Sequence, residues 1–224
     1  MNCYNTSSGD SSQNVVNGSW RDVKVPKTSG TNMSRAIQVA KYLINNGGLT
    51  KIQAAAVVGV YIDENGCNPN TWMKAEKNGK GAKGTGGFGY GAGIASWTGT
   101  EFKNIALKQA GFSEYTPIEE LGLDKQAKMV VGNINGNMKY YYNALKRCKN
   151  IEDASATAVC ITGGHTKQAK FKTHPTPADA QNVSNIYCKA NNRRFGVSEH
   201  HCSLYGRRLG YAKQVLAELT KLGY

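Results

Sequence analysis

The sequence has no long hydrophobic run. Its apolar stretches stay well short of the roughly 20 residues that a helix needs to cross a bilayer, so we expect no membrane span. Residues 1–18, MNCYNTSSGDSSQNVVNG, have neither the basic start nor the apolar segment of a secretory signal peptide. If the protein crosses a membrane, we expect another component or cell lysis to deliver it.

Cysteine is sparse, with six residues in 224, and none forms a Cys-x-x-Cys pair. The usual zinc-finger spacing is therefore absent. Cys188 and Cys202, with His200 and His201 between them, could bind zinc, but their separation is not a diagnostic spacing. We expect buried free thiols, with one or two disulfides in an oxidising compartment, and we expect no metal and no cofactor.

Acidic residues are few. The chain has 15 Asp and Glu against 28 Lys and Arg, which gives a formal net charge of +13. Such an excess favours polyanionic partners, and nucleic acid and an anionic cell wall are the two candidates. The cations are scattered, without a dense basic tail or an RNA-binding signature. The pattern therefore indicates an anionic surface and does not favour nucleic acid.

Hydrophobic periodicity divides the chain into a short arm and one domain. Residues 1–30 are rich in Ser, Asn and Gly and are predicted to form a flexible arm or linker, whereas residues 31–224 are predicted to form a single domain. Apolar spacing typical of helices predicts them over 32–47, 50–65, 100–110, 124–148, 152–162 and 205–222. We expect Thr50 to be the N-cap of the second helix and Gly66 to end it.

A glycine-dense stretch, 79–99, follows the second helix and is too rich in glycine to be helical. Near its end, aromatic and apolar residues alternate enough to predict a hairpin-like pair of strands or a structured loop. Residues 163–182 are predicted to be a loop, because Pro175 and Pro177 break any helix. The fold class that follows is mainly α (α+β), with a small glycine-rich β-hairpin inserted after the second helix.

The second helix offers a candidate general acid. Ile52, Ala56, Val60 and Glu64 stand four residues apart and so share one face, which is apolar until its last turn. A carboxyl group at the end of an apolar stripe is partly desolvated, which raises its pKa and keeps it protonated near neutrality. A general acid requires this property. The alternative is that Glu64 lies at a frayed helix end in solvent.

The glycine-rich segment indicates an open groove. Glycines such as Gly91 and Gly93 permit close approach of a polymer to the backbone. Tyr90 and Trp97 lie among them and could supply flat faces for sugar rings, although Trp97 is equally compatible with an ordinary core position. A GxGxxG match also occurs here, but it follows no strand and opens no helix, so it does not indicate a dinucleotide site.

Two segments together, QAAAVVGVYIDENGCNPN (53–70) and GGFGYGAGIASWTG (86–99), resemble the phage tail lysozyme family. That family belongs to the lysozyme-like superfamily, with goose-type lysozymes and lytic transglycosylases as relatives. The resemblance implies a lysozyme-like fold over residues 31–224, with Glu64 as the catalytic acid at the end of a helix that faces the groove. It places the predicted substrate-binding residues on the hairpin and at the groove edge. These are Tyr90, Gly91, Gly93, Ile94, Ser96, Trp97 and Tyr142.

The chain departs from the family's pattern at two places. Ser96 stands where a glutamine is usual, and no Asp or Glu occurs between Lys77 and Thr100, where goose-type relatives often carry a second carboxylate. Asp63 points about 100° away from Glu64 on a helix, so Glu76 and Glu101 are the better candidates for a base, although either could be a solvated surface acid. A lytic transglycosylase needs only one glutamate, because the 6-hydroxyl of the sugar attacks.

These inferences predict a muramidase that cleaves peptidoglycan glycan strands without a cofactor. The expected partners are bacterial peptidoglycan and, through residues 1–30, other phage tail or virion proteins; the expected location is the virion, its tail or the cell wall. The alternatives are a lytic transglycosylase with the same acid and a non-catalytic lysozyme-like protein that binds the wall or builds the virion. A Cys67–His165 peptidase dyad is a weaker alternative, because Cys67 follows the end of a helix rather than opening one.

Overall fold

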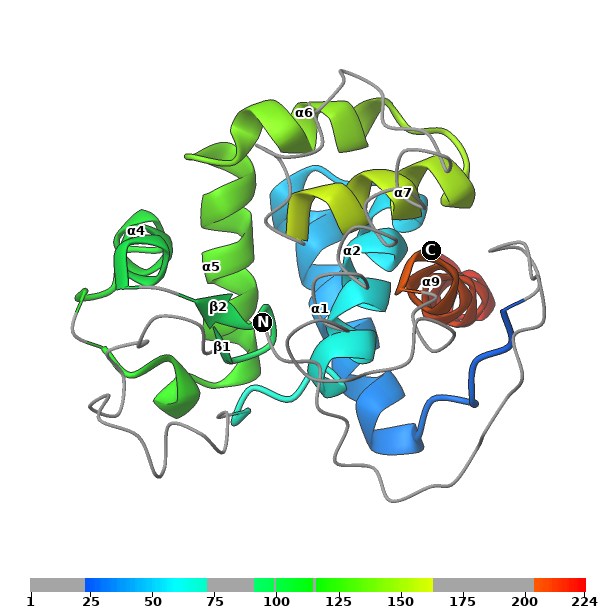
Figure 1. Ribbon diagram of the computed structural model, residues 1–224, viewed down its shortest axis with the longest axis horizontal. Helices are drawn as coiled ribbons and strands as arrows, with labels where there is room; N and C mark the ends of the chain where they lie inside the picture. Colours follow the sequence, from blue (N-terminus) through cyan, green and yellow to red (C-terminus); the bar gives the residue numbers. More distant parts are fainter. Residues whose placement is uncertain (1–22, 72–90, 99, 115, 163–203) are drawn as a thin grey trace, which may run out of the picture.

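The computed structural model describes residues 23–71, 91–98, 100–114, 116–162 and 204–224. Within these ranges the chain is mainly helical, which confirms the predicted α-rich fold class (Figure 1). No helix in these ranges is both long enough and apolar enough to span a membrane. The elements in chain order are α1 (Gly30–Gly47), α2 (Lys51–Asn65), β1 (Gly91–Ala92), β2 (Trp97–Thr98), α4 (Thr100–Gln109), η2 (Ile118–Glu120), α5 (Leu123–Asn135), α6 (Lys139–Arg147), α7 (Ile151–Thr162) and α9 (Leu204–Lys221).

Helix α2 is the central element of the fold. Its residues 53–62 are all buried, because α1, α7 and α9 pack around it (Figure 1). It begins with the predicted N-cap: Thr50 and Gln53 form a capping box, in which each side chain bonds to the other residue's backbone N–H. It ends at Gly66, whose φ of 68° lies in the left-handed region that glycine favours. Both expected ends of the second helix are therefore confirmed.

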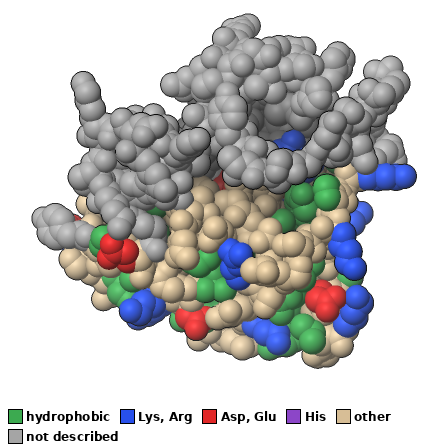
Figure 2. Space-filling model, turned by 90° about the horizontal axis from the view of Figure 1, so that it is seen from below, with side chains coloured by type: hydrophobic (Ala, Val, Ile, Leu, Met, Phe, Trp, Pro, Cys, Tyr) green, Lys and Arg blue, Asp and Glu red, His purple; other side chains and the backbone are tan. Residues whose placement is uncertain are grey.

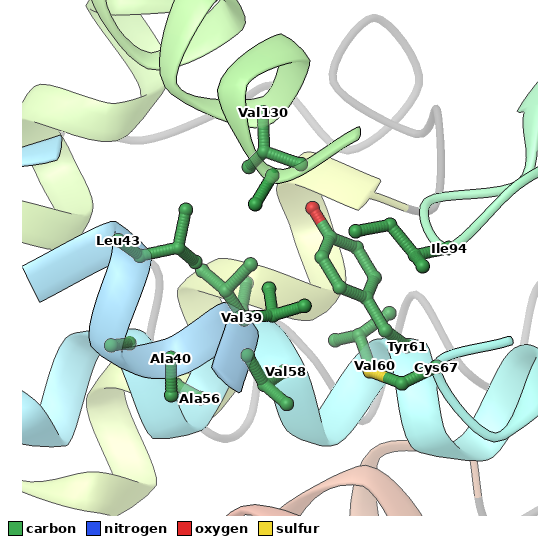
Figure 3. Close-up of a cluster of buried hydrophobic side chains, with 14 of the residues drawn as sticks. Val39, Ala40, Leu43, Ala56, Val58, Val60, Tyr61, Cys67, Ile94 and Val130 are labelled. Atoms are coloured by element: carbon green, nitrogen blue, oxygen red, sulfur yellow. The ribbon is translucent and has the colours of Figure 1, made fainter. Parts of the chain in front are cut away.

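The core gathers small and branched side chains of α1 and α2. Figure 3 shows Ala40 and Leu43 of α1 against Ala56 and Val58 of α2, with Val130 of α5 close by. At Gly59 of α2, an added Cβ would lie 2.7 Å from the backbone of α9, so the glycine permits the two helices to approach very closely. This approach brings the start of α9 beside the last turn of α2.

The predicted helix 124–148 is in fact two helices, α5 and α6. Gly136 leaves the helical conformation, with φ −104° and ψ −124°, and the chain turns before α6 begins at Lys139. The end of the Gln109 side chain lies against Gly136 and would have to move if a Cβ were added there. Apolar periodicity continued across the break, so a single helix was the wrong prediction.

Residues 23–29 run along the C-terminal helix. The backbone N–H and the hydroxyl of Thr28 both donate to Gln214 Oε1, and Gln214 Nε2 donates to the Pro26 carbonyl. Ser29 then caps α1 by accepting from the N–H of Asn32. The described end of the predicted arm is thus part of the packed domain, while residues 1–22 lie outside the described residues.

Strands β1 and β2 form a two-residue antiparallel ladder, in which Gly91 pairs with Thr98 and Ala92 with Trp97. The turn between them uses left-handed backbone at Gly93 (φ 69°) and at Ser96 (φ 47°). The N–H of Ser96 donates to the Gly93 carbonyl and closes the turn. The wider hairpin over 86–99 remains a prediction, because residues 72–90 lie outside the described part of the chain.

Candidate functional site

Glu64 lies in the last turn of α2, beside the β1–β2 turn. Its side chain is 7% exposed, and Oε1 accepts a hydrogen bond of 2.8 Å from Arg208 Nη2 of α9. Burial raises the pKa of the Glu64 carboxyl, the Arg208 charge lowers it, the Asp63 charge raises it, and hydrogen bonding by the Ser96 hydroxyl lowers it. Burial dominates, so the pKa is raised overall and protonated Glu64 persists to higher pH than an exposed glutamate would.

Asp63, the neighbour of Glu64, faces α9. Arg207 donates to it through Nε at 2.8 Å and Nη2 at 3.2 Å, and Arg208 donates through Nε at 3.3 Å. Its side chain is only 4% exposed. Asp63 is therefore committed to two guanidinium groups, which makes it a poor candidate for a base that must activate water.

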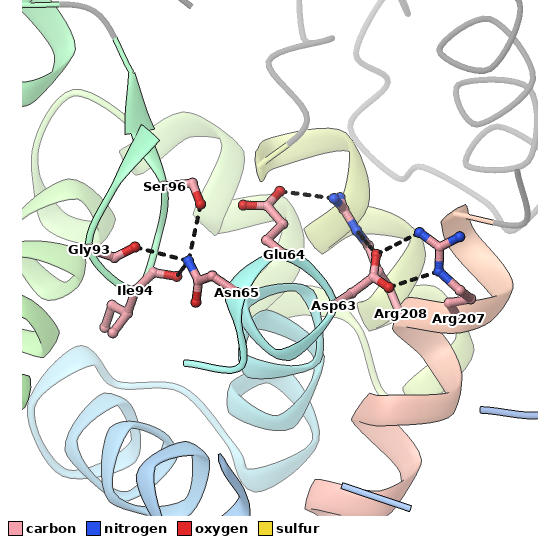
Figure 4. A network of polar contacts seen from close by, with 8 residues as sticks. All are labelled: Asp63, Glu64, Asn65, Gly93, Ile94, Ser96, Arg207 and Arg208. Carbon is pink, nitrogen blue, oxygen red and sulfur yellow. Dashed lines mark hydrogen bonds and ion pairs between the residues drawn. The ribbon is translucent and has the colours of Figure 1, made fainter. Parts of the chain in front are cut away.

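Asn65 joins the end of α2 to the β1–β2 turn (Figure 4). Its Nδ2 donates to the Gly93 carbonyl at 2.9 Å, the Ile94 carbonyl at 3.1 Å and Ser96 Oγ at 3.1 Å. Its Oδ1 accepts from the N–H of Asn68. The two residues that follow each other in the sequence, Glu64 and Asn65, thus have separate tasks: one presents the carboxyl group and the other fixes the turn next to it.

Gln126 of α5 also bonds to the β1–β2 turn. It is fully buried; its Oε1 accepts from the N–H of Ile94, and its Nε2 donates to three carbonyls at 2.8 Å each. Those carbonyls belong to Pro69, Ile118 and Leu121. A Cβ at Gly93 would lie 2.5 Å from Gln126 Oε1, so the glycine is required for this contact. Gln126 therefore fixes the loop after α2, the turn and η2 relative to one another.

The structure places the other predicted substrate-binding residues unevenly. Gly91 lies on the β1–β2 ladder, and Gly93 and Ser96 lie on its turn, where both accept hydrogen bonds from Asn65. Ile94 and Trp97 are buried in the core, so they support the turn from beneath. Contact of any of these residues with a glycan remains a prediction.

Tyr142 of α6 is buried and interacts with Tyr61 of α2. Burial raises the pKa of Tyr142 to about 12, and a hydrogen bond from Tyr61 partly opposes this rise. In this arrangement Tyr142 is part of the interior beneath the last turns of α2. Its predicted place at the groove edge remains a prediction.

The predicted second carboxylates cannot be placed against Glu64. Glu76 and Tyr90 lie outside the described residues, and Glu101 stands in the first turn of α4. Their roles remain predictions. In the described ranges, no group of three or more His, Cys, Asp or Glu side chains could hold a metal ion; Cys188, His200, His201 and Cys202 lie outside those ranges.

The Cys67 thiol does not suit a nucleophile. Cys67 is fully buried directly after the end of α2, and burial raises its pKa well above the usual range. A reactive cysteine needs a lowered pKa and access to substrate. His165, the other member of the alternative dyad, lies outside the described residues.

Three residues of the site were not singled out from the sequence: Gln126, Arg207 and Arg208. A signal for Arg208 was present, because it shares the helical stripe of Ala212, Val215 and Leu219, all of which are buried. Gln126 likewise stands four residues before Val130 on the buried face of α5. A polar residue on an apolar stripe predicts a buried, hydrogen-bonded side chain.

Comparison with known families agrees with this geometry. The match of a family model places the chain among lysozyme-like proteins that act on peptidoglycan. That model describes phage tail lysozymes and matches residues 34–195, well over half of the chain, so the chain belongs to the phage tail lysozyme family. The resemblance predicted from residues 53–70 and 86–99 is thereby confirmed, and membership supports an association with phage tails. No curated protein and no solved structure matches the chain significantly.

Proposed function

We propose that this protein cleaves the β-1,4 bond between N-acetylmuramic acid and N-acetylglucosamine in peptidoglycan, with Glu64 as the general acid. The observation that supports this most strongly is the state of Glu64. It is a nearly buried carboxyl group with a raised pKa, at the end of the central helix and beside a glycine turn. A raised pKa favours the protonated form, which can donate its proton to the leaving glycosidic oxygen.

Bond cleavage then proceeds through an oxocarbenium-like transition state. In hydrolysis with inversion, a second carboxylate activates a water on the opposite face of the sugar. Glu76 and Glu101 are the proposed candidates for this base. Asp63 is not, because both of its oxygens accept from arginines.

A lytic transglycosylase is the second candidate function. The engagement of Asp63 by Arg207 and Arg208 favours it, because the nearest carboxylate among the described residues cannot serve as a free base. In that reaction Glu64 first protonates the leaving oxygen and then, as a carboxylate, accepts the proton of the 6-hydroxyl that attacks the anomeric carbon. The product is an anhydro sugar and no water is consumed.

The positive charge supports binding to the anionic wall. Lys and Arg side chains are spread over the face shown in Figure 2, with acidic side chains between them. A net charge of +13 attracts a polyanionic surface, and salt weakens the attraction. We propose that the N-terminal arm (residues 1–30), of which residues 23–29 pack along α9, connects the domain to other tail or virion proteins.

Digestion of purified peptidoglycan tests these proposals. Wild type, Glu64→Gln and Glu218→Gln would be incubated with it, and the released muropeptides analysed by mass spectrometry. Glu218 is a matched control, because it is a partly exposed glutamate of α9 that pairs only locally with Lys221. We expect wild type and Glu218→Gln to release products and Glu64→Gln to release none.

The mass of the products separates the reactions. Reducing-end muropeptides would establish a hydrolase, a muramidase if the reducing sugar is N-acetylmuramic acid and a glucosaminidase if it is N-acetylglucosamine, whereas products lighter by one water would establish a transglycosylase. Intact peptidoglycan from several bacteria after treatment with wild type would refute catalysis. The protein would then be a lysozyme-like wall-binding or virion structural protein.

A further inference from the structure

The side chain of Arg208 is buried at the junction of α2 and α9. It is 3% exposed, and it donates to Asp63 through Nε and to Glu64 through Nη2 (Figure 4). The close contact of Gly59 with the backbone of α9 involves the Arg208 carbonyl itself. The position of the guanidinium is therefore fixed by helix packing as well as by its hydrogen bonds.

A gain in folding stability does not by itself explain why an arginine is buried at position 208. Its Nη1 is buried and has no hydrogen-bond partner among the described residues. An unsatisfied buried donor opposes folding, and buried ion pairs are often no more stabilising than apolar side chains of similar size. Departures of this kind are expected at functional sites. The family match ends at residue 195, before α9, so family membership assigns no role to Arg208.

We propose that Arg208 is a positioning residue for the general acid: anchored by Asp63, its guanidinium fixes the direction of the Glu64 carboxyl group and favours its ionised form. This inference rests on the proposed role of Glu64. Ser96 lies on the opposite side of the carboxyl group, so Glu64 is held between α9 and the β1–β2 turn (Figure 4).

The arrangement suits a proton donor. Burial raises the pKa of Glu64 and so favours its protonated form, whereas Arg208 stabilises the carboxylate that remains once the proton has gone to the glycosidic oxygen. The charged or titratable groups that face Glu64 in the described structure are Arg208 from α9 and Asp63 and Tyr61 from α2. Without Arg208, Glu64 would hold its proton more tightly and would be a weaker acid.

The test measures the ionisation of Glu64 directly. The carbon-13 shift of its carboxyl group would be titrated by NMR in wild type, Arg208→Gln and Lys213→Gln, with Glu64→Gln used for assignment. Lys213 is a matched control, because it is an exposed cation of α9 that pairs with Glu152 and not with Glu64. We expect Arg208→Gln to titrate at higher pH than wild type and Lys213→Gln to titrate as wild type does.

Activity gives a second readout that a merely structural role would not produce. For Arg208→Gln on soluble peptidoglycan fragments, we expect the alkaline limb of the pH–rate profile to move to higher pH. We also expect the maximal rate to fall by roughly ten- to a hundredfold, less than on loss of the acid itself. A lower rate with an unmoved alkaline limb would overturn the inference.

The two proposals fail separately. An unchanged or lower pKa of Glu64 in Arg208→Gln overturns the inference about Arg208, even if the enzyme is active. Intact peptidoglycan with wild type overturns the proposed function, while the titration still decides the effect of Arg208 on Glu64. If Arg208→Gln does not fold, Arg208→Met replaces it, because an apolar side chain of similar length leaves no unpaired buried donor; the pKa of Glu64 should again rise, and an unchanged or lower pKa would overturn the inference.

Discussion

Substitution of Gly59 by alanine should destabilise the protein by driving α2 and α9 apart. The added Cβ would lie 2.7 Å from the Arg208 carbonyl oxygen, 2.7 Å from the Ala212 nitrogen and 2.9 Å from the Ala212 Cα. All three are backbone atoms, so no side-chain rotation relieves the overlap and a helix must move. Overpacking of this kind costs about 3 kcal/mol, whereas alanine is better than glycine in a helix by about 1 kcal/mol. The net loss should be about 2 kcal/mol, or roughly 4–8 °C in Tm.

Urea unfolding followed by circular dichroism would measure this loss. The control is Gly30→Ala at the start of α1, where no atom lies within 4 Å of the new Cβ. That variant should be as stable as wild type or up to about 1 kcal/mol more stable. The reasoning is refuted if Gly59→Ala unfolds at the same urea concentration as wild type or at a higher one.

Three further predictions concern the side chains around the turn. Gln126→Leu should lose about 3 kcal/mol, because four backbone groups lose a hydrogen bond to one buried side chain; an unchanged urea midpoint would contradict this. Asn65→Asp should lower the Tm at pH 7, because a carboxylate would face the carbonyls that now accept from Asn65, and equal melting of the two proteins would count against it. The stability of Glu64→Gln relative to wild type should increase with pH, from about 4.3, the ordinary pKa of glutamate, up to the raised pKa of Glu64 in the folded protein. Over this range wild type loses stability, because only it must keep a proton on, or ionise, a buried carboxyl group. A difference independent of pH over that range would refute the raised pKa.

The sequence was sufficient to predict the helices because their signals are local. Thr50 and Gly66 delimit α2 through capping preferences that act within one turn. The break between α5 and α6 was missed because the apolar spacing continues across Gly136, where the backbone leaves the helical conformation. Apolar spacing alone does not report such a break.

The site was predicted only in part, because local signals can be read from the sequence and contacts between distant residues cannot. Glu64 could be singled out because its surroundings on α2 repeat at helical spacing. Its partner Arg208 lies 144 residues further along the chain, and the pairing depends on how closely α9 packs at Gly59. Asn65 could be identified as polar and close to the helix end, but its three bonds to the turn require the folded loop.

The separation of Glu64 and Arg208 has a consequence for synthesis on the ribosome. When α2 leaves the exit tunnel, Arg208 has still to be translated, and the groove of α2 at Gly59 has no helix to fill it. Glu64 therefore acquires its cation only when α9 docks, after both helices have been made. A nascent or proteolytically shortened chain that ends before residue 204 carries Glu64 without Arg208, so the ion pair between the two residues exists only in chains that include α9.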